Sequence, residues 1–376
     1  MLGPLGPAQI ACLASWRQSG IRTHFLHTEP SPLPKALRRI ADRYDHLGSL
    51  APLDEARAAQ IGAVLTAAGS DRLTCLSEQV TLRLWRFRSL LGPEVTLLTS
   101  PADVIVAMES KALQVNLARA SGFDVLPTTL LTSAEQASAG GISYPLVLRP
   151  DRASLDPSFK AMFIHGADEL ERFFAGRAPG APAVVAQRFI DGPNVVVHGS
   201  RSTSGELLGL SGYIVRLKND GVSVTLEPWA LPLSLSAACN AFAVRAGLVG
   251  VFHFDLLFDV ATAGVWFLEV NARLGGTTAK VCASGYDEPR ALLWAFGLSA
   301  PPTLALSTAV PVVNRLAALR CLIKAVRGSG SPVDHPFPSR RAVALRSLRA
   351  MFGFRDEVLR PLHPLGTLAF LSQYFR

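Results

Sequence analysis

The sequence predicts an α/β (α+β) protein, on three observations. Helix-like and strand-like segments alternate along residues 1–95, as they do in βα-type, Rossmann-like domains. Two runs rich in Val, Phe, Leu and Trp, Phe252–Asp259 and Gly264–Val270, are separated by the turn-prone sequence Ala-Thr-Ala-Gly and predict a β-hairpin. Of the 376 residues 49% are hydrophobic, so the chain can bury the cores of two or three subdomains.

In the first 95 residues we expect, in order, a helix, a strand, a helix, a strand and a helix, at Ala8–Ser19, Thr23–His27, Pro52–Ala68, Arg72–Leu76 and about Glu78–Leu91. A glycine-bearing turn that runs into a helix normally follows a strand, yet only Met1 and Leu2 precede the turn Gly3–Gly6. We therefore expect the first strand of this sheet to be missing, either because the start codon is misassigned or because the sheet has a bare edge.

The middle of the chain, residues 96–299, is expected to hold most of the strands. After a short link at Leu97–Val104, the expected helices are Ala107–Gly122, Gly166–Phe174, Leu233–Ala246 and Arg290–Gly297, and the expected strands are Tyr144–Pro150, Ala183–Ile190, Asn194–Gly199 and Glu206–Leu217. The loop Asp151–Lys160 contains Arg152, Ser154, Ser158 and Lys160 but no glycine. Its backbone amides therefore have less freedom to cradle a phosphate group.

The predicted hairpin carries polar side chains that suit a metal ion. Because strand side chains alternate, Glu269 and Asn271 share one face, and three oxygen ligands converge if Asp255 lies opposite Glu269. An isolated acid on a hairpin is usually only solvated, but acids in an otherwise apolar strand are costly unless they are paired or bound to metal. Mg²⁺ prefers a few carboxylates together with phosphate oxygens. We therefore predict a metal site at Asp255, Glu269 and Asn271.

The residues directly after the hairpin suit an anion. Arg273 offers a planar guanidinium for phosphate, and Gly275 and Gly276 allow backbone amides to approach an anion closely. The pattern Glu-x-Asn-x-Arg followed by a glycine-rich loop resembles the end of the last sheet in the ATP-grasp superfamily. The resemblance runs from about Lys111 to Gly297, roughly half of the chain. It implies an ATP-grasp fold at residues 96–299, a Rossmann-like leading domain at residues 1–95, and a mostly helical extension at residues 300–376.

The resemblance also implies ATP and Mg²⁺, or Mn²⁺, as cofactors, and it assigns roles to individual residues. Lys111 and Arg149 match the positions that approach the nucleotide phosphates, although relatives usually have lysine at the second of these. The hinge between the two halves of the fold falls near residues 187–192, where the backbone would hold adenine. Asn194 stands where the family often has a glutamate for the ribose. The residues implied are Lys111, Arg149, Gln187, Arg188, Phe189, Ile190 and Asn194 for the nucleotide, and Arg273, Gly275 and Gly276 for catalysis.

The chemistry implied is a carboxylate–amine ligase that activates an acid as an acylphosphate and forms ADP. Its partners would be a small-molecule carboxylate and an amine. The same cradle could serve a thiol acceptor, or bicarbonate and carbamoyl chemistry, and a nucleotide-binding protein without turnover is a further alternative. No general base stands out: His253, on the strand face of Asp255, is one candidate, and a satisfied core histidine is the competing interpretation. Arg216 and Lys218 offer a place for an acidic substrate group, and a solvated strand edge explains them equally well.

Composition narrows the classes of ligand and of cell compartment that the sequence allows. The net charge of +8 suits anionic ligands or a membrane surface, but no basic block interleaved with aromatics predicts nucleic-acid binding. Five cysteines without CxxC spacing fit a reducing cytoplasm, and no segment predicts an integral membrane span. Apolar residues at helical spacing in Val312–Val326 predict a helix packed on the core, with a basic amphipathic membrane contact as the alternative. The sequence is also compatible with a homodimer.

Overall fold

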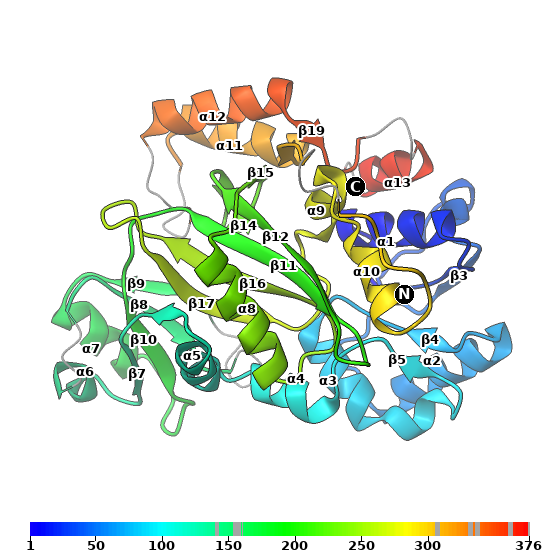
Figure 1. The fold of residues 1–376 in the computed structure, drawn as a ribbon, viewed down its shortest axis with the longest axis horizontal. Coiled ribbons are helices and arrows are strands. Elements are labelled where there is room, and N and C mark those ends of the chain that lie inside the picture. Colours follow the sequence, from blue (N-terminus) through cyan, green and yellow to red (C-terminus); the bar gives the residue numbers. More distant parts are fainter. Residues whose placement is uncertain are drawn as a thin grey trace.

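The computed structural model describes residues 1–139, 143–152, 159, 161–304, 309–329, 334, 339–359 and 364–374. The predicted loop Asp151–Lys160 lies largely outside these residues, including Ser154, Ser158 and Lys160. Within the described residues, the chain forms a small parallel α/β unit, a four-stranded antiparallel sheet and a long mixed sheet that reaches across the molecule (Figure 1).

The first 97 residues form a parallel sheet with helices around it. Strand β1 (Leu2–Gly3) pairs with β2 (His24–His27), which pairs with β3 (Arg43–His46), while β4 (Arg72–Leu73) pairs with β5 (Thr96–Leu97). The Leu2 N–H donates to the Thr74 carbonyl at 2.9 Å, and a parallel bridge joins Leu2 to Cys75. The expectation of a missing first strand is therefore wrong, because Leu2–Gly3 forms that strand and is bonded on both sides.

Two of the three α-helices of this unit begin where a polar side chain caps them. The three helices are α1 (Pro7–Gln18), α2 (Glu55–Ala68) and α3 (Glu78–Arg86), with 3-10 turns η1 (Lys35–Ile40) and η2 (Arg88–Leu91). Asp54 accepts a hydrogen bond from the Arg57 N–H, so α2 begins three residues later than its sequence suggests. The Ser77 side chain accepts from the Val80 N–H in the same way and starts α3 at Glu78.

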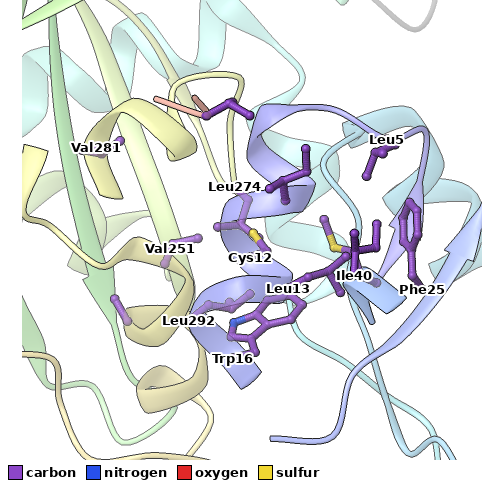
Figure 2. Packing of buried hydrophobic residues seen from close by; sticks show 14 of the residues in the cluster. Leu5, Cys12, Leu13, Trp16, Phe25, Ile40, Val251, Leu274, Val281 and Leu292 are labelled. Atoms are coloured by element: carbon purple, nitrogen blue, oxygen red, sulfur yellow. The ribbon is translucent and has the colours of Figure 1, made fainter. Parts of the chain in front are cut away.

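Helix α1 packs the first unit directly against the long sheet. Leu13 and Trp16 share one buried cluster with Val251 of β16 (Gly250–Phe258) and Leu292 of α10 (Glu288–Ala295), and Figure 2 shows Trp16 beside Leu292. The Trp16 indole N–H donates to the Pro289 carbonyl at 2.9 Å. The first unit and the sheet therefore share one apolar core, which fixes their relative position.

The four-stranded sheet is antiparallel throughout. Its order is β7-β10-β8-β9, formed by β7 (Thr128–Leu131), β8 (Leu146–Pro150), β9 (Met162–Ile164) and β10 (Val184–Arg188). Helices α6 (Glu135–Ala139) and α7 (Ala167–Ala175) accompany it. Leu131, Leu146 and Leu170 form its small core. This sheet carries Arg149 and Gln187, two of the predicted site residues.

The long sheet has the order β19-β18-β15-β12-β11-β16-β17-β6. The remaining strands are β6 (Asp124–Val125), β11 (Asn194–Arg201), β12 (Leu207–Val215), β15 (Thr225–Pro228), β17 (Val265–Asn271), β18 (Val312–Val313) and β19 (Arg355–Asp356), and β13 (Lys218–Asn219) pairs with β14 (Val222–Ser223) beside them. The predicted hairpin is confirmed, because β16 and β17 pair in antiparallel register with Asp255 directly opposite Glu269.

Alternation along β16 separates its two faces. Phe252, Phe254 and Leu256 pack into one cluster with Phe242 of α8 (Leu233–Arg245) and with residues of α4 (Ala102–Met108) and α5 (Lys111–Ala120). Val251 lies in the cluster of the opposite face, with α9 (Thr278–Ser284) and α10. Asp255 therefore belongs to the face that looks toward the first unit. The predicted single helix Ala107–Gly122 is two helices, because Ser110 interrupts it and caps α5 by accepting from the Leu113 N–H.

The C-terminal part adds α11 (Arg315–Arg327), α12 (Arg340–Gly353) and α13 (Pro364–Tyr374). A buried ion pair of 3.1 Å between Lys280 of α9 and Glu357 joins this part to the long sheet, with the two side chains 4% and 1% exposed. Helix α11 packs on the core as predicted, but it does so through Ala318 and Cys321, whereas Val326 of the predicted apolar stripe is 76% exposed. No helix in the described ranges is long and apolar enough to cross a bilayer.

Candidate functional site

A cleft of about 530 Å³ lies where the four-stranded sheet faces the long sheet. It collects side chains from α3, α5, β8, β10, β11 and the β16–β17 hairpin, which are far apart in sequence. Of the predicted site residues, the ones that line it are Lys111, Arg149, Gln187, Arg188, Phe189, Ile190, Asn194, Asp255, Glu269, Asn271 and Arg273. Gly275 and Gly276 lie just beyond Arg273 and are not among the lining residues.

The predicted metal ligands meet at the floor of this cleft. Asp255 pairs with Glu269 across the two strands, and the Asn271 side-chain amide donates to Asp255 Oδ2 at 3.1 Å. The two carboxylates keep 24% and 29% of their side-chain surface exposed, toward the cleft that they line. One extra residue in β17 forms a β-bulge directly after this pair, since Leu256 pairs with Phe267 rather than Leu268. The bulge leaves the Leu268 carbonyl outside the regular ladder.

The electrostatics of this pair favour a cation. Burial, and then the neighbouring charge of Glu269, raise the pKa of Asp255 to about 7. A divalent ion between the two carboxylates would remove this repulsion. No group of three or more His, Cys, Asp or Glu with ligand spacing occurs in the described part of the chain. The donor set therefore fits Mg²⁺ held by two carboxylates and an amide, with phosphate oxygens and water completing the shell, and does not fit a closed all-protein site.

This pKa predicts that Mg²⁺ binding depends on pH. Below about pH 7 the free Asp255 carboxyl is mostly protonated, and the ion must displace that proton, so its apparent affinity should fall about fivefold between pH 7 and pH 6. Calorimetric titration of Mg²⁺ in the presence of ADP measures this dependence. Glu78→Gln should leave the dependence in place, whereas equal affinities at pH 6 and pH 8 in the wild type would contradict the assignment.

Arg149 connects the two sheets beside the carboxylates. Its guanidinium donates to Glu269 Oε2 at 2.9 Å, to Gln187 Oε1 at 3.0 Å and to the freed Leu268 carbonyl at 3.0 Å. Burial is the main cause that lowers its pKa from the usual value, and the Glu269 charge opposes that shift. The three acceptors are shared between the two terminal nitrogens of the planar guanidinium, an arrangement that the single nitrogen of a lysine does not reproduce. This explains why the chain has arginine at the position where the resembled family usually has lysine.

Lys111 reaches the same carboxylate from helix α5. Its Nζ lies 4.0 Å from Glu269 Oε2, and burial is the main cause that lowers the pKa of this ammonium. Two polar side chains position the helix. Gln114 donates to the Val270 carbonyl at 3.1 Å and accepts from the Val270 N–H at 2.8 Å, and Asp151 accepts from the Ala112 N–H at 2.9 Å. Lys111 and Arg149 therefore form a cationic rim over Glu269.

The hinge residues form the apolar end of the cleft. The Phe189 N–H donates to the Pro145 carbonyl at 3.0 Å, and the rings of Phe163 and Phe189 lie 5.6 Å apart, edge to face. Gly192 is required for close approach, since a Cβ there would overlap the Phe258 carbonyl oxygen. Asn194 Oδ1 is buried at the cleft without a hydrogen-bond partner among the described residues. An acceptor in that state is suited to a ligand hydroxyl.

A buried network of hydrogen bonds supports the loop that follows β17. Arg273 donates to Asn271 Oδ1 at 3.2 Å and to the Leu274 carbonyl at 3.1 Å. The Gly275 N–H donates to the Thr278 hydroxyl at 3.0 Å, so that amide already has a partner. Glu288 accepts from the same hydroxyl at 2.5 Å and bonds His198 Nδ1 at 2.6 Å.

Gly275 also has a steric reason to be glycine. A Cβ at this position would come within 2.5 Å of the His253 ring. That ring is buried and stacks on His198 at 5.1 Å. Burial holds the pKa of His253 well below its usual range, and the nearby His198 adds to that shift. His253 is therefore a neutral core histidine, and the alternative in which it serves as general base has no support here.

Sequence reasoning missed Glu78. This residue opens α3, lines the cleft, and makes no hydrogen bond or ion pair with any described residue. Burial raises its pKa to about 7, against the opposing effect of Arg273. The available signal was its place directly after a strand of a parallel α/β unit, which is where such units bind ligands. Lys218 also lines the cleft, as expected for an acidic substrate group, whereas Arg216 is not a lining residue and lies 3.8 Å from Glu227.

No protein-family model matches this sequence, and no curated protein sequence matches it either. Solved structures do match. Biotin carboxylase from Campylobacter jejuni, in a β,γ-ATP complex, has a TM-score of 0.65 at 18% identity, over 82% of this chain and 73% of that one. N5-carboxyaminoimidazole synthetase from Staphylococcus aureus, complexed with ADP, has a TM-score of 0.62 at 15% identity, over 87% of this chain and 85% of that one. Rhizobium etli pyruvate carboxylase gives 0.67 at 18% identity over 82% of this chain, which spans 30% of that protein.

Proposed function

The chain has the ATP-grasp fold, as its sequence predicted, and from that premise we propose that it is an ADP-forming ligase that uses ATP and Mg²⁺ to join a carboxylate to an amine. The observation that carries the proposal is the cluster on the cleft floor. Asp255 and Glu269 lie opposite each other, with Lys111 and Arg149 above and Arg273 beside them. Two acids next to three cations suit a metal-bound triphosphate better than acids alone or cations alone would.

Each part of the cleft has a place in the proposed reaction. Adenine would lie along residues 187–190, with its ribose at Asn194 and its phosphates toward Lys111 and Arg149. Asp255, Glu269 and Asn271 would hold Mg²⁺, which neutralises charge on the transferred phosphoryl group when bound. Lys218, on the opposite wall, would bind the substrate carboxylate. No covalent bond to the protein is needed, so catalysis would come from positioning and charge.

The proposed chemistry has two steps. A carboxylate oxygen of the acid attacks the γ-phosphorus of ATP, the bond to the β–γ bridging oxygen breaks, and ADP leaves. The amine nitrogen then attacks the acyl carbon, the bond from that carbon to the phosphate oxygen breaks, and inorganic phosphate leaves. The proton that the nitrogen loses would pass to Glu78 in its ionised form, a cleft carboxylate that makes no hydrogen bond or ion pair with any described residue.

Arg273→Ala should slow the phosphoryl step more than it weakens nucleotide binding. Arg273 adjoins Asn271, whereas residues 187–190, where adenine would lie, line another part of the cleft. We expect kcat to fall by about a hundredfold, comparable to the loss of one preorganised transition-state donor, with the Kd for ADP changing less than threefold. Single-turnover kinetics and ADP titration measure the two effects. A variant that loses only nucleotide affinity would contradict this role.

Glu78→Gln should remove a proton acceptor without removing ATP binding. Because the pKa of Glu78 is raised to about 7, its basic form increases as pH rises through 7, so wild-type kcat should increase over the same range. The variant should lose about a hundredfold in kcat and lose this rise, while acid-dependent ADP formation persists without an amine. The exposed Glu94 offers a matched control as Glu94→Gln. An unchanged pH profile in Glu78→Gln would exclude it as the base.

The function is tested by mixing the protein with ATP, Mg²⁺ and pairs of acids and amines, and measuring ADP and product mass. Bicarbonate belongs in the acid panel, because one structural neighbour, the biotin carboxylase domain of Hydrogenobacter thermophilus 2-oxoglutarate carboxylase, was crystallised with MgADP and bicarbonate. Amide products that require both substrates support the ligase. Carboxylated products support the alternative with bicarbonate. Measurable ATP binding without ADP formation for any pair would favour a nucleotide-binding protein without turnover.

A further inference from the structure

Helices α11 and α12 carry a surface that the proposed ligase reaction does not use. The two helices pack against each other and lie side by side on one outer side of the molecule (Figure 1). Their inward residues belong to one cluster, with Ala318 and Cys321 from α11 and Ala350 from α12. Because both helices bury one face in the same cluster, the opposite faces of both point away from the body of the protein.

Those outward faces are apolar. On α11 the positions Leu319, Ile323 and Val326 follow an i, i+4, i+7 spacing, and on α12 the positions Leu345, Leu348 and Phe352 follow i, i+3, i+7, so each set forms a single stripe. All six side chains are at least 40% exposed, and Val326, Leu345 and Phe352 reach 76%, 68% and 82%. Large exposed apolar side chains gathered in this way are unusual on a soluble surface and mark contact sites.

Arginines border these apolar stripes, although not every cation of the two helices faces outward: Arg315 donates to the Met351 carbonyl, Arg346 donates to the Arg216 carbonyl, and Lys324 is paired with Asp220. Neither helix contains an Asp or Glu, while α11 carries Arg315, Arg320, Lys324 and Arg327, and α12 carries Arg340, Arg341, Arg346 and Arg349. Three of these arginines, Arg327, Arg341 and Arg349, are exposed and make no hydrogen bond or ion pair with any described residue. Helical spacing sets them beside the apolar stripes, since Arg349 lies one turn from both Leu345 and Phe352, and Arg327 one turn from Ile323.

We propose that this outer face of α11 and α12 binds the surface of an anionic phospholipid bilayer. Apolar side chains flanked by arginines, without acids, match an interface whose headgroups are negative and whose acyl region is apolar. A second copy of the chain, related by a two-fold axis through this face, would bring Arg327, Arg341 and Arg349 close to the same arginines of the first copy, which opposes a symmetric dimer there. Nucleic acid would match the arginines but would leave the six apolar side chains without a partner. The alternative of a membrane contact for residues 312–326 therefore gains support from a second helix.

Sedimentation with sucrose-loaded vesicles tests the proposal on the full chain. Wild-type protein should bind vesicles of phosphatidylcholine and phosphatidylglycerol at 3:1, and should bind phosphatidylcholine alone at least about tenfold more weakly. Raising the salt concentration should release it. The double variant Leu345→Ser with Phe352→Ser should lose at least about tenfold in partition coefficient by removing apolar insertion. Arg341→Gln with Arg349→Gln should lose a similar factor by removing charge.

A matched control separates this face from exposed apolar residues in general. Leu233, at the start of α8, is 89% exposed and outside this face, so Leu233→Ser should bind anionic vesicles as the wild type does. Because all five substituted positions are exposed or outward-facing, the variants should unfold at the wild-type temperature. The proposal would be overturned if both double variants bound anionic vesicles as strongly as the wild type does. It would also be overturned if the wild type did not bind those vesicles. Light scattering that shows a dimer which the serine substitutions dissociate would overturn it as well, since the face would then be a subunit interface.

Discussion

Glu269→Gln is expected to abolish Mg²⁺-dependent ADP formation while the protein stays folded. Glu269 faces Asp255 across the hairpin and accepts from Arg149, so the change removes one of two carboxylates on the cleft floor and keeps the shape of the side chain. We expect kcat/KM to fall by at least about a thousandfold, or roughly 4 kcal/mol of transition-state stabilisation, as for the loss of a catalytic metal ion.

The folded state should tolerate this change. Glutamine can still accept the Arg149 hydrogen bond, and the guanidinium keeps Gln187 and the Leu268 carbonyl. The midpoint of thermal unfolding without ligand should therefore move little, while the stabilisation that Mg²⁺ and ADP together provide should disappear. Glu171→Gln, at an exposed position of α7, is the matched control. Retained turnover in Glu269→Gln would remove this residue from the metal site.

Arg149→Ala is expected to lose both activity and stability, and Arg149→Lys should rescue neither in full. The side chain is 8% exposed and bonds acceptors on β10 and β17. Removing it leaves Glu269 and Gln187 without that donor, and we expect a cost of roughly 3 kcal/mol, the low end for a broken buried pair because Glu269 is partly exposed. Lysine can reach one acceptor with a single ammonium group but cannot keep all three bonds.

Urea unfolding and ATP titration together measure this prediction. The alanine variant should have a lower midpoint and no measurable ATP affinity, and the lysine variant should lie between it and the wild type. Arg245→Ala, at an exposed position of α8, controls for the loss of a surface cation. Wild-type activity in Arg149→Lys would show that a point charge is enough, and wild-type activity in Arg149→Ala would remove this residue from the site.

Local patterns predicted the hairpin well because its information is local. Alternation and a four-residue turn were enough to predict the hairpin and to put Glu269 and Asn271 on one face, and the structure meets the condition that Asp255 lies opposite Glu269. The bulge at Leu268 was not predictable, since no residue type there demands it, and its effect appears only when Arg149 arrives from another sheet. Glu78 was missed for the same reason, because the residues around it, such as Lys111 and Arg273, join it through the tertiary fold alone.

Periodicity likewise predicted α11 but not its surroundings. Spacing identified a stripe of Val312, Leu316, Leu319, Ile323 and Val326, and a stripe is normally assigned to the core, but its last three members are exposed. The residues that enter the core are the small ones, Ala318 and Cys321, because α12 and β13 approach the helix on that side. Which face of such a helix is buried depends on the size of the residues that the neighbouring element can accommodate. The sequence of the helix alone does not show this.

The ion pair between Lys280 and Glu357 limits how the last part of the chain can be studied. A protein shortened at residue 300 would lack Glu357, so the buried Lys280 ammonium group would have no counter-charge. The long sheet would also lose β18 and β19. A loss of activity in the shortened protein would therefore follow from damage to its fold. The C-terminal segment therefore has to be examined by single exchanges at its outer surface, and any natural variant lacking it would have to replace that missing counter-charge elsewhere.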